Sequence, residues 1–134
     1  METAIEKNWE VYALKYAERA DRTRSDSFIF DDHSYHAHTI DYFIWVLKSE
    51  KDIIVVDTGY DYDEAKRRDR PIQRAPSEAL KAINVEANDV TDVIITHLHY
   101  DHAGGLKDFP NAKFHLQETE MAYATGPCLS LIHI

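Results

Sequence analysis

The chain has 134 residues, which is enough for one modest domain and too short for two ordinary ones. Hydrophobic residues make up 44% and charged residues 29% of the sequence, with 4 glycines and 4 prolines, so disordered, collagen-like and low-complexity classes are excluded. The net charge of −9 disfavours nucleic acid as a partner, and the single cysteine excludes an internal disulfide framework. Neither an apolar run of membrane-spanning length nor a secretory signal is visible. These features predict a soluble, cytoplasmic protein that binds neither membranes nor nucleic acids.

The first part of the chain predicts three strands and one long loop. Residues 11–17 alternate with a period of two, which is typical of a strand. Residues 21–39 are polar and irregular, and this predicted loop carries His33, His36 and His38. Two continuous apolar runs, 42–47 and 53–56, are joined by a polar turn. They predict an antiparallel pair that is covered on both faces.

The second part of the chain alternates helices with buried strands. The sequence predicts a charged surface loop or short helix at 61–74, then a helix opened by Pro76 and a buried strand at 92–96. A short glycine-containing helix, a strand at 113–117 and a helix at 118–124 are predicted to follow. This alternation, without any internal repeat, predicts a layered α/β structure with helices outside the strands. The last strand and helix have no visible continuation to pack against.

A cluster of metal-binding residue types follows the predicted strand at 92–96 directly. His97 and His99 are two positions apart, so at an extended strand end they point to the same side. Asp101 and His102 follow where the chain turns into a helix. Three imidazoles and a carboxylate form a nitrogen and oxygen donor set that suits zinc, iron or manganese. A histidine after a strand is usually an ordinary polar residue, but four such groups at this spacing favour a metal site.

This His-x-His-x-Asp-His motif resembles the signature of the metallo-β-lactamase superfamily, and Asp57-Thr58-Gly59 resembles the first motif of that family. The surrounding sequence is similar to the N-acyl-homoserine lactonase-like branch in three segments, 41–46, 96–104 and 109–118. The resemblance covers about residues 10–127. It implies an α/β fold that is the N-terminal half of an αββα sandwich, incomplete in this chain.

The resemblance also implies roles for individual residues. His97 and His99 would hold one metal ion, and Asp101 and His102 a second, with two zinc ions as the expected cofactors and iron or manganese as alternatives. Asp57 would orient metal ligands without binding the metal itself, although it could instead be a simple turn residue. A hydroxide that bridges the metals would attack the substrate carbonyl, and Asp101 would pass a proton to the leaving alkoxide.

The function implied is a metal-dependent hydrolase that opens N-acyl-homoserine lactones or related lactones, with a small lactone or acyl ester as its partner. A glyoxalase II-like thioester hydrolase and a β-lactamase are the alternatives within the superfamily. A non-catalytic metal-binding module is the alternative from another class, although structural zinc sites favour cysteine ligands, which the motif lacks. The histidines of the 31–40 loop could line a substrate cleft. The charged run 66–70 could bind an anion, but such runs are usually solvated.

The resemblance requires a further His, a bridging Asp and a last His downstream, and the chain offers no match for them. His115 comes too early, and His133 lies in a terminal segment that does not resemble the family. Residues 129–134 match the translation of CTG TCT CTT ATA CAC ATC, the end of a widely used transposase sequencing adaptor, although a short native apolar tail is the alternative. We therefore expect residues 1–128 to form a partial metallo-β-lactamase-like domain, followed by a non-native tail at 129–134. The fragment alone is expected to be inactive.

Overall fold

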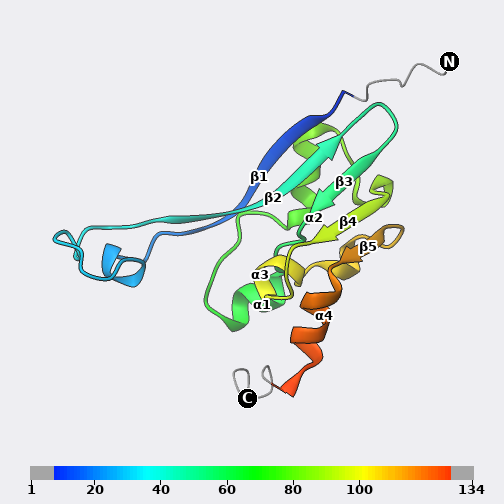
Figure 1. Cartoon of the computed structure of the whole chain (residues 1–134). Helices are drawn as coiled ribbons and strands as arrows, with labels where there is room; N and C mark the ends of the chain where they lie inside the picture. Colours follow the sequence, from blue (N-terminus) through cyan, green and yellow to red (C-terminus); the bar gives the residue numbers. More distant parts are fainter. Residues whose placement is uncertain (1–7, 128–134) are drawn as a thin grey trace.

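The computed structural model describes residues 8–127 and shows one mixed sheet of five strands in the order β1-β2-β3-β4-β5 (Figure 1). The first three strands pair antiparallel, whereas β3, β4 and β5 pair parallel. The strands are β1 (Glu10–Arg19), β2 (Ile40–Lys48), β3 (Ile53–Val56), β4 (Asp92–Ile95) and β5 (Lys113–Leu116). All the predicted strands are confirmed.

Four short α-helices connect or follow these strands, and they confirm the mixed α/β prediction. They are α1 (Tyr62–Arg67), α2 (Pro76–Ala79), α3 (Tyr100–Ala103) and α4 (Glu118–Thr125), with 3-10 turns at Arg24–Asp26, Leu80–Ile83, Ala87–Asp89 and Leu106–Asp108. The charged segment 61–74, which was predicted to be a surface loop or a short helix, contains α1. Asn84 ends the turn after α2 in the left-handed conformation, with φ of 55°.

Within residues 8–127, only one face of the sheet is covered, so the prediction that 42–47 and 53–56 are covered on both faces is wrong there. The covered face packs Ile44, Val46 and Val55 against Leu80 after α2, and all four side chains are fully buried. The opposite face carries neighbouring apolar side chains that remain exposed, with Trp45 49% and Val11 61% accessible. The alternation of β2 produces this difference, because successive side chains point to opposite faces.

The site-bearing loops gather at one edge of the sheet. Strand β1 runs antiparallel to β2, and β2 runs antiparallel to β3, so β1 points the same way as β3, β4 and β5. The segments that follow these four strands therefore leave the sheet at the same edge. Parallel strands with helical connections commonly place their ligand sites at such a carboxyl edge.

The segment between β1 and β2 forms an arm that projects from this edge, away from the rest of the sheet (Figure 1). Its two limbs meet at a bridge between Thr23 and Ala37. Within the arm, the rings of His33 and His36 stack with centroids 4.9 Å apart, and His38 packs edge-on against Phe28. The predicted loop is thus confirmed, and its histidines make their ring contacts within the arm.

Several sequence features lie outside the described residues. These are Cys128, His133 and the expected non-native tail 129–134. Within residues 8–127, no helix combines the length and the apolar composition needed to cross a membrane.

The uncovered apolar face predicts that the chain associates with itself when it is expressed alone. We expect the 134-residue chain to bind an apolar dye and to sediment as more than a monomer. Replacing Trp45 with Lys should lower dye fluorescence by about twofold or more, because it places a charge on this apolar face. Phe30→Lys is the matched control, since Phe30 is a fully exposed aromatic residue in the arm.

The measurements are dye fluorescence and sedimentation velocity on the purified chain. A monomer that unfolds cooperatively and binds no dye would contradict this prediction. Equal effects of the two substitutions would also contradict it, because exposure alone, rather than this face, would then explain the association.

Candidate metal centre

Asp57 begins the loop after β3 in a strained backbone conformation. Its φ of 62° lies in the left-handed region, which non-glycine residues seldom adopt, and its side chain is buried. The Asp57 N–H donates to the carbonyl of Ile94 at 2.8 Å, which ties the loop to β4. The strain thus turns the carboxylate inward, toward the residues that follow β4.

The Asp57 carboxylate orients two histidines of the motif. Its Oδ2 atom lies 2.7 Å from His102 Nδ1, and its oxygens accept from the Thr96 N–H at 2.8 Å and from the Thr96 hydroxyl at 2.7 and 3.0 Å. Because a carboxylate only accepts, His102 Nδ1 is the donor. The Thr96 hydroxyl gives its proton to Asp57, so it accepts from His97 Nδ1 at 3.1 Å. In its neutral form, each of these rings then keeps a lone pair on Nε2.

Close backbone packing fastens α3 to the loop after β3. The Thr58 N–H donates to the carbonyl of His102 at 2.7 Å, and the Gly104 N–H donates to the carbonyl of Gly59 at 2.8 Å. A Cβ atom on Gly105 would lie 2.6 Å from the Thr58 carbonyl oxygen, and one on Gly59 would lie 2.5 Å from the Pro76 ring. Larger residues would therefore separate the motif from the loop that orients it.

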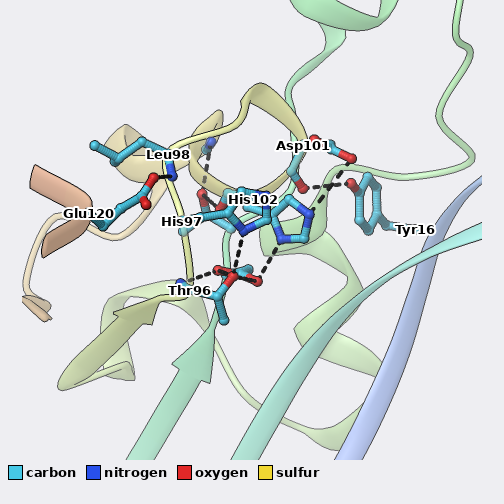
Figure 2. Close-up of polar contacts among 10 residues, drawn as sticks. Tyr16, Thr96, His97, Leu98, Asp101, His102 and Glu120 are labelled. Atoms are coloured by element: carbon cyan, nitrogen blue, oxygen red, sulfur yellow. Dashed lines mark hydrogen bonds and ion pairs between the residues drawn. The ribbon is translucent and has the colours of Figure 1, made fainter. Parts of the chain in front are cut away.

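The structure brings the four predicted ligands together at the carboxyl edge of β4. The His97 ring lies 3.9 Å from the His102 ring and 4.7 Å from the His99 ring, measured between centroids. His102 Nε2 faces Asp101 Oδ2 at 3.8 Å, and the buried Tyr16 hydroxyl donates to the Asp101 carbonyl at 3.3 Å (Figure 2). The strand end and the first turn of α3 thus supply one compact group.

Within residues 8–127, no three His, Cys, Asp or Glu side chains have donor atoms arranged to hold a metal ion. The chemistry of the donor set nevertheless fits one, because it combines three imidazoles with a carboxylate. The bonds that fix Nδ1 of His97 and His102 are of the kind that usually orients histidine ligands. The residues present therefore fit a metal ion in type and orientation, although their donor atoms do not converge on one point.

The electrostatics of the cluster follow from burial and from the Asp57 bonds. Burial by itself would raise the pKa of Asp57, but the hydrogen bonds with His102 and Thr96 outweigh it and hold this pKa below its ordinary value. The bond to Asp57 raises the pKa of His102. Burial, together with the neighbouring imidazoles, lowers the pKa of His97 and so favours its neutral form.

A cavity of about 410 Å³ opens beside the motif. Its wall combines motif residues with residues from the segment after α1 and from α4: Arg68, Leu98, His99, Tyr100, Asp101, Glu120, Tyr123 and Ala124. No residue of the arm lines it, so the described structure does not place the loop histidines at this cavity. The cavity is large enough to hold a small organic molecule beside Asp101 and His99.

Sequence reasoning missed several residues that hold the motif in place. Glu120 in α4 accepts from the Leu98 N–H at 2.9 Å, between the two strand-end histidines (Figure 2). Thr96 links Asp57 to His97, and Tyr16 bonds to the carbonyl of Asp101. The position of Thr96 directly before the motif was an available signal. No local pattern connects Glu120 or Tyr16 with the motif.

The described residues thus form a mixed sheet that carries the His-x-His-x-Asp-His motif at its carboxyl edge. Residues 41–125, more than half of the chain, match the family model described as the metallo-beta-lactamase superfamily. The chain therefore belongs to the metallo-beta-lactamase superfamily.

Curated relatives and solved structures resemble the chain over part of their length. The chain is 42% identical over 48 residues to the N-acyl homoserine lactonase AttM of Azorhizobium caulinodans, which covers 36% of this chain and 18% of the relative. It is 35% identical over 69 residues to the probable metallo-hydrolase YqjP of Bacillus subtilis, covering 52% and 19%. The chain thus spans much less than two thirds of these relatives.

Among solved structures, a quorum-quenching N-acyl homoserine lactone lactonase matches with a TM-score of 0.62 and 22% identity, over 94% of this chain and 51% of that chain. The dizinc lactonase AidC matches with a TM-score of 0.60 and 21% identity, over 90% and 45%. These likenesses confirm the predicted fold, in which the chain corresponds to about half of a metallo-β-lactamase domain.

The bond between Glu120 and Leu98 predicts that α4 stabilises the loop between the two strand-end histidines. In Glu120→Ala, we expect the Leu98 amide proton to move upfield and to exchange with solvent about tenfold faster, because its acceptor is lost. Glu120→Gln keeps an acceptor oxygen and should restore most of the protection. Amide NMR spectra and hydrogen exchange of the labelled chain measure both effects.

Glu118→Ala is the matched control, since Glu118 lies in the same first turn of α4 and is exposed. It should leave the Leu98 amide unchanged. The same loss of protection at every amide of α4 and β5, without a larger effect at Leu98, would contradict the specific role of Glu120.

Proposed function

We propose that this chain supplies the metal-binding half of a hydrolase that opens N-acyl-homoserine lactones or related lactones. One observation carries the metal part of this proposal: the buried Asp57 carboxylate fixes Nδ1 of His102 directly and Nδ1 of His97 through Thr96, which leaves both Nε2 atoms for a metal ion. The similarity to curated N-acyl homoserine lactonases supports the substrate class.

In this proposal His97 and His99 hold one metal ion, and Asp101 and His102 hold a second, with zinc expected and iron or manganese as alternatives. Bound metal would make water nucleophilic near neutral pH and would polarise the scissile carbonyl. Asp101 lines the cavity and would carry a proton on its carboxylate to the leaving alkoxide. Asp57 and Thr96 keep the two rings in one tautomer, and the cavity wall positions the substrate.

A chain that spans half of a metallo-β-lactamase domain is expected to lack some of the ligands. We therefore propose that residues 1–128 form a partial domain and that the 134-residue fragment is inactive alone. We also propose that 129–134 is not native sequence, because it matches the translated sequencing adaptor. Tests of activity accordingly use the complete product of the gene from which this sequence comes.

The metal assignment predicts different losses for different substitutions. In the complete gene product, His97→Ala or His99→Ala should each remove about one equivalent of metal, and Asp101→Ala or His102→Ala should each remove the other. Asp57→Ala should weaken metal affinity by about 10- to 100-fold, because it frees the rings without removing a ligand. Metal content by mass spectrometry and competition with a chelating dye measure these effects.

His115→Ala is a matched control, because His115 makes a comparable 2.7 Å bond to Asp92 on the neighbouring strands but lies outside the motif. It should retain both metal ions. Retention of two metal ions in Asp101→Ala would refute the assignment of Asp101 as a ligand.

The lactonase assignment predicts the order of substrate preference. The metal-loaded gene product should show a higher kcat/KM for N-hexanoyl-homoserine lactone than for a glutathione thioester or a β-lactam. A nucleophile activated by metal suits any of these acyl carbonyls, so the cavity wall must select among them. Parallel assays with zinc and with manganese measure the order. A glutathione thioester or a β-lactam as the best substrate would refute the lactonase assignment and leave the metal assignment intact.

A further inference from the structure

Tyr100, which lies between His99 and Asp101 in the motif, is held by two arginines from the charged run. An Arg70 terminal nitrogen donates to the Tyr100 hydroxyl, and the Arg68 guanidinium carbon lies 3.7 Å above the centre of its ring. The Tyr100 ring also packs against the buried Tyr60 ring, with centroids 5.5 Å apart. These contacts fix one wall of the cavity beside the motif.

The charged run 66–70 is therefore only partly solvated, because some of its arginines contact Tyr100. The Arg67 side chain is 64% exposed, whereas Arg68 and Arg70 turn toward Tyr100. Arg68 Nε donates to Glu64, which also bonds to Arg67. Because Arg67 and Arg68 both bond its carboxylate, the pKa of Glu64 falls to about 2, so Glu64 stays charged.

These contacts hold the Arg68 guanidinium in one plane and use only one of its nitrogens. In the described part of the chain, neither terminal nitrogen of Arg68 has a hydrogen-bond partner, although Arg68 lines the cavity together with His99 and Asp101. A guanidinium that is fixed through Nε and by stacking presents its terminal N–H groups as a rigid fork. Such a fork binds carbonyl or carboxylate oxygens.

We propose that Arg68 is a specificity-determining residue that binds an acceptor oxygen of the substrate outside the ring to be opened. This inference rests on the proposed function. With a lactone ring beside Asp101 and His99, the N-acyl substituent continues along the cavity wall toward Arg68, and its amide oxygen is the acceptor. After ring opening, the new carboxylate is a second acceptor of the same chemistry, and the experiment separates the two.

The test compares two lactones that share a ring and differ in the amide, N-hexanoyl-homoserine lactone and γ-butyrolactone, on the metal-loaded complete gene product. Arg68→Met keeps the length of the side chain and removes its donors. It should raise KM for the acylated lactone about tenfold with kcat nearly unchanged, and leave both constants for γ-butyrolactone nearly unchanged. Arg68→Lys should restore part of the loss, because it keeps one charged donor.

Arg67→Met is the matched control, since Arg67 bonds to the same Glu64 but does not line this cavity. It should leave both lactones unaffected. An equal effect of Arg68→Met on the two lactones, or no effect on either, would overturn the proposal.

Titration calorimetry with N-hexanoyl-homoserine, the opened product, forms the second arm. A loss of affinity in Arg68→Met for this product, without a change in KM for the lactone, identifies the carboxylate as the bound acceptor and overturns the proposal. A rise in KM for the acylated lactone supports the amide oxygen, which the opened product also carries. The calorimetric arm also works if the gene product hydrolyses neither lactone, an outcome that refutes the proposed function. In that case, about tenfold weaker binding to Arg68→Met supports the Arg68 site, and equal binding overturns it.

Discussion

The buried carboxylate of Asp57 is the interaction on which the motif depends. It joins two segments that are far apart in the sequence, because it accepts from Thr96, 39 residues away, and from His102, 45 residues away. A buried carboxylate without such donors would be costly, so the fold stabilises Asp57 only when the motif closes over it. The strained backbone of Asp57 is compatible with this reading, since strain persists where the surrounding contacts fix it.

Close backbone contact makes this arrangement possible. Main-chain hydrogen bonds join Thr58 and Gly59 to α3 and the residue that follows it. Gly105 lies so close to the Thr58 carbonyl that a side chain at position 105 would collide with it. These contacts hold the first turn of α3 against the loop that follows β3. The sheet consequently sets the direction in which the Asp101 and His102 side chains project from this turn. A rigid secondary-structure element positions such side chains more precisely than a free loop would.

Patterns confined to a few residues predicted most of the fold and the motif. Apolar runs and alternation located the strands, and the spacing of His97, His99, Asp101 and His102 located the cluster. The contacts of Glu120 with Leu98, 22 residues away, and of Arg70 with Tyr100, 30 residues away, depend on how α4 and α1 pack, which no local pattern contains. The uncovered face was missed for another reason: β2 is apolar on both sides, so its sequence indicated burial on both.

A metal centre requires that its ligand rings be oriented and that their donor atoms converge on one point, and these two requirements are met separately in this fold. The groups that orient the rings, Asp57 and Thr96, are in contact with His97 and His102 within the described residues, so orientation needs no further partner. Convergence of the donor atoms is not achieved there, although the rings lie 3.9 to 4.7 Å apart. Tautomer and ring direction are thus fixed by the fold, whereas the last adjustment of the rings is left to whatever they bind. This division explains why a motif can be well placed in a chain whose donors do not yet form a closed coordination shell.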